Sequence, residues 1–214
     1  MRSASLLLLL LSAGCGSTPR LMESPRLSEG LIAILIHDVS ESPAYAGLAD
    51  GLNEGGVRWG VGIFEKEGED GTAMDRILQY REEYPGKPVW LVGHADGAGL
   101  VLGLLEELPG KSTVEGVILL APDLNPELNL APYLRRSRKG IWNFHSPSGT
   151  GAGGPTGFEE PEGLRQSDRD LYRTELQQIP WSEEMRLAGH EGRSWDWLEP
   201  RFVRGYIAPI VRES

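Results

Sequence analysis

One short stretch constrains the fold of this chain more than any other. Residues 88–92 form an apolar run typical of a buried strand, and residues 100–108 have the composition of a helix. The turn between them places Gly93 and Gly97 two positions either side of Ala95. Such a sharp turn presses the strand against the helix, so the flanking residues must be small. The pattern therefore predicts a strained turn that lifts the Ala95 side chain off the end of a buried strand.

Apolar runs and helical patterns alternate along the chain from about residue 31. This alternation predicts an α/β fold with a doubly wound, mostly parallel sheet of about six strands, covered by helices on both faces as a three-layer sandwich. With 214 residues, 40% of them hydrophobic, the chain can form one domain with a sizeable core. The predicted strands are 31–36, 57–64, 88–92, 114–120, 141–145 and 185–188, and the predicted helices are 43–53, 72–84, 100–108, 168–178 and 200–211.

The amino-terminal segment is typical of an export leader. Arg2 supplies a positive charge, and residues 6–11 form an apolar run too short to span a bilayer. Small residues then lead directly to Cys15, the only cysteine of the chain. The sequence Leu-Ser-Ala-Gly-Cys resembles a bacterial lipobox, in which the signal peptide is cut before a lipidated cysteine. We predict a signal peptide over residues 1–14 and an exported protein anchored in the cell envelope by lipid on Cys15; an ordinary secretory leader is the alternative.

Residues 15–30 are rich in Ser, Thr, Pro, Arg and Glu. This composition predicts a lipidated, flexible tether without a packed element, followed by one domain over residues 31–214. The formal net charge of −10 disfavours nucleic acid, or an anionic membrane surface, as an electrostatic partner. The predicted membrane partner is therefore reached through the lipid on Cys15.

The order of elements between residue 31 and about Asn125 resembles the α/β-hydrolase family. The resemblance rests on a strand followed by His37, the glycine-flanked turn at Ala95, and a strand ending in Leu-Leu-Ala-Pro at Pro122. In its lack of a long insertion after Pro122, the chain is similar to small lidless bacterial lipases. The resemblance implies that strand 31–36 lies beside the strand before Ala95, and that ligands bind at the carboxyl ends of the strands.

In that family the turn at Ala95 is the nucleophile elbow, and the residue at its tip attacks the substrate. A methyl group cannot attack a carbonyl, so Ala95 leaves this position without a nucleophile. The backbone donors of the oxyanion hole fall on Asp38 and Asp96. Their carboxylates oppose the negative charge that such donors must stabilise. The resemblance therefore implies a cleft that has lost its chemistry at more than one position.

The family's acid and base positions are less well matched. A triad acid follows a late strand, where Asp123 is the available candidate. The family's histidine lies between the last strand and the last helix, where His190 stands, although Ser194 is closer to the helix. We expect ordinary structural roles for the other conspicuous residues, which are His37, His94, Trp195 and Trp197.

These positions favour a catalytically silent protein that binds an unknown small molecule or protein at the old cleft, without a cofactor. The alternative is an active hydrolase in which Asp96 attacks, as an aspartate does in haloalkane dehalogenases. An attack by a loop serine is a variant of this alternative and lacks the geometry of an elbow. The loop serines concerned are Ser40, Ser42 and Ser146.

Two further hypotheses carry less weight. Gly93, Gly97 and Gly99 could form a phosphate-binding turn similar to that of short-chain dehydrogenases, but Asp96 would face the anion and no Tyr-x-x-x-Lys follows. Asp38 and Asp96 could hold a cation or an amine at the mouth of the cleft. Solvated loop acids that cap helices are the simpler interpretation, and no metal centre is predicted beyond this pair.

Overall fold

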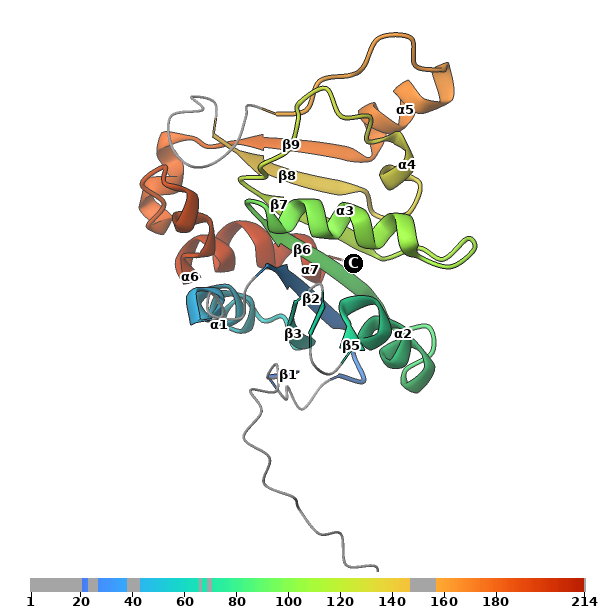
Figure 1. The fold of residues 1–214 in the computed structure, drawn as a ribbon. Coiled ribbons are helices and arrows are strands. Elements are labelled where there is room, and N and C mark those ends of the chain that lie inside the picture. The colour runs from blue at the N-terminus through green and yellow to red at the C-terminus, as the bar shows by residue number, and fades with distance from the viewer. Residues whose placement is uncertain are drawn as a thin grey trace, which may run out of the picture.

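A seven-stranded sheet forms the centre of the protein (Figure 1). The computed structural model describes residues 21–22, 27–37, 43–65, 67–68, 71–146 and 157–213. Six parallel strands follow the order β3-β2-β6-β7-β8-β9, and β1 adds antiparallel at the β3 edge. The sheet strands are β1 (Leu21–Met22), β2 (Leu31–Ile36), β3 (Gly60–Glu65), β6 (Val89–His94), β7 (Gly116–Leu120), β8 (Ile141–His145) and β9 (Leu176–Pro180), and β4 (Glu67–Gly68) pairs separately with β5 (Gly71–Thr72).

Helices cover both faces of this sheet, so the predicted α/β class is confirmed. In Figure 1, α2 and α3 lie over one face, while α1 and the carboxyl-terminal helix lie over the other. The last helix is continuous through a single π-helical segment, η4. The helices are α1 (Ala46–Glu54), α2 (Ala73–Glu83), α3 (Gly97–Glu107), α4 (Ala131–Leu134), α5 (Gln166–Thr174), η2 (Glu183–Ala188), η3 (Ser194–Leu198), α6 (Pro200–Phe202), η4 (Val203–Ile207) and α7 (Ala208–Arg212).

The apolar runs of the sequence become strands that are buried on both sides. In β2, Leu31, Ala33 and Leu35 join the core under α2 and α3, whereas the alternate isoleucines join the core under α1 and α7. This two-residue alternation follows from the pleat of a strand. A strand between two helical layers needs apolar residues at every position, which is why β2 has no polar face. As the resemblance implied, β2 pairs with β6 in parallel.

The prediction was wrong about the sixth strand. It is β9, which begins at Leu176 inside the predicted helix 168–178, and the predicted strand 185–188 lies in the 3₁₀-helix η2. Within the described residues, β9 is an edge strand that pairs with β8. Both of its glutamines are exposed, so its sequence lacks the apolar run by which a buried strand is predicted. Pro180, which lacks an N–H donor, is tolerated at such an edge.

Residues of the predicted tether form hydrogen bonds with the domain at two points. Leu21–Met22 pairs with β3, and the Tyr80 hydroxyl donates to the Leu27 carbonyl oxygen at 2.7 Å. The expectation that residues 15–30 contain no packed element was therefore wrong at these two points. Cys15 and the predicted leader lie outside the described residues. Within the described part of the chain, no helix is long and apolar enough to cross a membrane.

Candidate functional site

The turn predicted from the glycine spacing joins β6 to α3. Ala95 lies at its tip with φ at +51°, in the left-handed region that strains any residue with a side chain. The Ala95 N–H donates to the Leu120 carbonyl at 2.9 Å, and its carbonyl accepts from the Asp123 N–H at 3.0 Å. These two bonds tie the tip of the elbow to the end of β7.

The flanking glycines are required by direct contact between backbones. A Cβ atom on Gly93 would lie 2.7 Å from the Cα of Ala98, and one on Gly97 would lie 2.5 Å from the carbonyl oxygen of Leu35. Both distances are shorter than real Cβ contacts allow. The strand, the turn and the helix therefore interlock as the sequence pattern required, although position 95 carries only a methyl group.

His94, beside the elbow tip, is a buried structural histidine. Its Nε2 lies 2.9 Å from the Ser194 carbonyl oxygen and 3.1 Å from the Ser194 hydroxyl, and its Nδ1 lies 3.4 Å from the Tyr45 hydroxyl. Because a carbonyl only accepts hydrogen bonds, Nε2 carries the proton. Burial lowers the pKa of His94, although the Ser194 carbonyl and the Asp96 charge oppose this shift. The neutral ring therefore donates to the η3 segment and has no lone pair to offer the Ser194 hydroxyl.

The segment between β9 and the last helix brings Ser194, and not His190, into contact with His94 beside the elbow. His190 is wholly buried between the rings of Trp197 and Phe202, with centroid separations of 4.0 and 5.1 Å. Its Nδ1 accepts from the Gly192 N–H at 3.0 Å, and its Nε2 has no partner in the described residues. Burial lowers the pKa of His190 to about 4, against an opposing effect of Asp196. His190 is thus a neutral core residue.

Asp196 organises the loop between His190 and η3, and it was not among the predicted site residues. Its carboxylate accepts from the backbone N–H groups of Glu191 and Arg193 at 3.0 and 2.9 Å, and from the Arg193 side chain. Burial disfavours the charge, but the hydrogen bonds and the positive charge of Arg193, together with a smaller effect of His190, outweigh it, so the pKa of Asp196 lies below its usual value. An acid three residues after the N-cap of a short helix, here Arg193, is a capping pattern that could have indicated this role.

Trp195, expected to pack like Trp197, has a different environment. Its side chain is 51% exposed, whereas Trp197 is 1% exposed and packs in the core. The Trp195 ring lies against the rings of His94 and Tyr45, at centroid separations of 4.8 and 6.2 Å. It therefore presents an open aromatic face beside the elbow.

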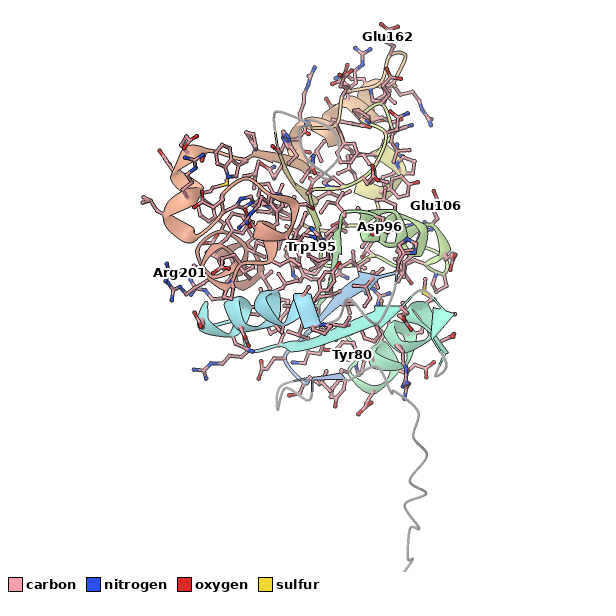
Figure 2. The ribbon with its side chains drawn as sticks, turned by 60° about the vertical axis from the view of Figure 1, so that its left-hand side comes forward. Tyr80, Asp96, Glu106, Glu162, Trp195 and Arg201 are labelled. Atoms are coloured by element: carbon pink, nitrogen blue, oxygen red, sulfur yellow. The ribbon has the colours of Figure 1, made fainter. Side chains whose placement is uncertain are left out.

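The two acidic residues of the predicted site that the structure describes, Asp96 and Asp123, lie in solvent. Asp96, labelled with Trp195 in Figure 2, is exposed, and its carboxylate lies 3.8 Å from the Nε2 of His37, an ion pair when that ring is protonated. Asp123 is also exposed, and its carboxylate has no hydrogen-bond or salt-bridge partner in the described residues. No group of three or more His, Cys, Asp or Glu side chains within the described ranges could hold a metal ion.

The remaining candidates are separated from the elbow or lie outside the described residues. Ser146 follows β8, which β7 separates from β6. His145, at the end of β8, accepts from the Gly157 N–H at 3.0 Å. The candidates that the structure does not describe are Asp38, Ser40 and Ser42.

The chain aligns with solved structures of an esterase domain and of a predicted hydrolase. An esterase domain of a protein from Rhodothermus marinus aligns at 14% identity with a TM-score of 0.53, over 88% of each chain. A predicted CIB-like hydrolase from Thermoplasma acidophilum aligns at 15% identity with a TM-score of 0.48, over 88% of this chain and 89% of its own. No family model matches the sequence, and no curated protein matches it significantly. The alignment with the esterase domain, together with the strand order, shows that this protein has the α/β-hydrolase fold.

Proposed function

We propose that this protein is a catalytically silent member of the α/β-hydrolase fold, exported and lipid-anchored through Cys15. It would bind a small molecule or a protein at the cleft beside the elbow. The observation that carries the proposal is Ala95, which keeps the strained backbone of a nucleophile elbow without a group that can attack. In serine hydrolases, loss of the nucleophile alone lowers turnover by about 10⁶-fold.

The positions around Ala95 support the same conclusion. Ser194, whose hydroxyl lies 3.1 Å from the Nε2 of His94 next to Ala95, cannot act as a general base, because a hydroxyl does not take a proton at neutral pH. The neighbouring His94 uses its Nε2 proton on the Ser194 carbonyl. A nucleophile introduced at position 95 would therefore have no base positioned to activate it.

The open ring of Trp195 supports a binding role for the cleft. Among the described residues, only two large hydrophobic side chains are more than half exposed, Trp195 and Leu187. Its contacts with His94 and Tyr45 hold the ring in place, so a ligand that covers it would not have to order it first. Stacking on a fixed aromatic face is a common way to bind a planar or apolar group.

Active-site labelling tests the absence of catalysis. We expect no labelling of the wild type, or of Ala95→Ser, by a fluorophosphonate probe, and no ester hydrolysis above background. The double variant Ala95→Ser, Ser194→His supplies both missing groups and is expected to gain labelling. Robust wild-type labelling would refute the silent function, and ester hydrolysis by the wild type that is lost in Asp96→Asn would instead favour the alternative in which Asp96 attacks.

Lipid attachment is tested separately in bacterial cells that express the full chain. Metabolic labelling with an alkyne fatty acid should tag the wild type, and membrane fractions should contain it. Replacing Cys15 with serine is expected to abolish tagging, because the acceptor thiol is lost. Equal tagging of the Cys15→Ser chain would overturn the anchor and would leave the proposal about the cleft unaffected.

A further inference from the structure

The end of the sheet opposite the elbow contains a cavity. It has a volume of about 540 Å³ and lies where β6 and β7 begin, between the end of α2 and the loop that follows α3. In Figure 1 both segments lie on the side of the sheet where the central strands β6 and β7 begin. The silent-hydrolase proposal makes no use of this region.

The charge of this cavity is opposite to that of the whole protein. Four basic side chains line it, against the single carboxylate of Glu115, although the chain carries a formal net charge of −10. Glu115 contacts only one of them, Arg138, at 3.8 Å. The other three have no acidic partner in the described residues: Arg81, Lys87 and Lys111.

The two arginines are held side by side by one residue. The Nη2 of Arg81 donates to the Thr113 carbonyl at 2.6 Å, and the Nε of Arg138 donates to the Thr113 hydroxyl at 3.2 Å. Burial lowers the pKa of Arg81, and the charge of Arg138 lowers it further. Like charges repel each other, and an anion between the two guanidinium groups would turn this cost into attraction.

The positions of helix ends explain only part of this arrangement. Cations near the carboxyl terminus of a helix compensate its dipole, and Arg81 lies in the last turn of α2. That effect requires neither a cavity nor a second guanidinium on the same threonine. The lysines at positions 87 and 111 lie beyond the ends of their helices, yet line the same space.

We propose that this cavity binds a phosphate-bearing anion. Guanidinium groups match phosphate oxygens in paired hydrogen bonds, and ammonium groups add charge without fixed geometry. The surplus of positive charge suits a dianion better than a single carboxylate. The volume also leaves room for an organic group beside the phosphate. Free phosphate compounds and phospholipid headgroups share this chemistry.

Calorimetry and thermal unfolding of the purified full-length chain test the site with inorganic phosphate and short-chain phosphatidylglycerol as probes. We expect saturable binding of at least one probe and a rise in melting temperature of at least about 2 °C that grows with the logarithm of its concentration. Sodium chloride at equal ionic strength controls for screening. Tighter binding of inorganic phosphate identifies a free anion as the ligand, and tighter binding of the lipid identifies a headgroup.

Two variants localise the effect. The first is the double variant Lys87→Gln, Lys111→Gln, which changes exposed side chains and should fold normally. We expect it to weaken binding by at least about 10-fold. Arg201→Gln, on an exposed surface at α6, removes a positive charge elsewhere and should leave binding unchanged (Figure 2). Binding of neither probe to the wild type, or equal weakening by both variants, would overturn the proposal.

Discussion

Replacing Gly97 with alanine is expected to lower the free energy of unfolding by about 3 kcal/mol or more. The new Cβ would lie 2.5 Å from the Leu35 carbonyl oxygen, which belongs to the central strand β2. A side chain could rotate away from such a contact, but this backbone atom is fixed by pairing with β3 and β6. The clash therefore has to separate α3 from the sheet. Urea unfolding followed by circular dichroism measures the loss.

Gly103 supplies the matched control within the same helix. A Cβ at this position would have no neighbour within 4 Å, so alanine adds no clash. Because alanine is a better helix former than glycine, Gly103→Ala should stabilise the protein by about 0.5 to 1 kcal/mol. Similar unfolding curves for Gly97→Ala and Gly103→Ala would contradict the close packing of α3 on β2.

Acidification from pH 6.5 to pH 4 is expected to cost about 3 kcal/mol of stability through His190 alone. Burial lowers the pKa of this histidine from 6.5 to about 4 in the folded chain. The unfolded chain therefore takes up the proton first, and stability rises with pH across this interval. The contribution is complete above pH 6.5 and is lost as the pH falls to 4. Burial also lowers the pKa of His94 and His145, which adds to the same trend.

Urea unfolding at pH 7, 5.5 and 4.5 measures this dependence. His190→Asn keeps an acceptor near the Gly192 N–H but cannot be protonated, so its stability should change less with pH than that of the wild type. His37→Asn removes an exposed histidine and should retain the loss at acid pH. An equally steep dependence in His190→Asn would show that His190 does not cause it.

The parts of the fold that were predictable are those in which one residue type is sterically required. Gly93 and Gly97 predicted the elbow because nothing larger fits against Ala98 and Leu35. Strands that are buried on both faces, such as β2, were also predictable, because every position in them must be apolar. The edge strand β9 was missed because only Leu176 is fully buried in it, and a helix could use the same residues.

The candidate site was predictable at its tip but not in its surroundings. Ala95 is defined by local sequence, whereas the contact between His94 and Ser194 joins residues 100 positions apart. No periodic pattern in the sequence indicates a contact between residues so far apart. The resemblance made His190 the candidate base because of its place before the last helix. The aromatic rings that bury it belong to Trp197 and Phe202, on elements that follow it in the chain. Burial of a polar residue depends on what packs over it, which a single sequence does not state.

The strained backbone at Ala95 also makes the elbow a fixed attachment point. Its conformation is set by contacts of Gly93 and Gly97 and by bonds to Leu120 and Asp123, none of which involve the side chain at position 95. Residues 31–214 contain no cysteine, because the chain's only one is Cys15. An Ala95→Cys chain would thus carry one thiol in the domain, held at the tip of the elbow. A fluorophore coupled there would lie near His94 and Trp195 and would report on a ligand that binds beside the elbow.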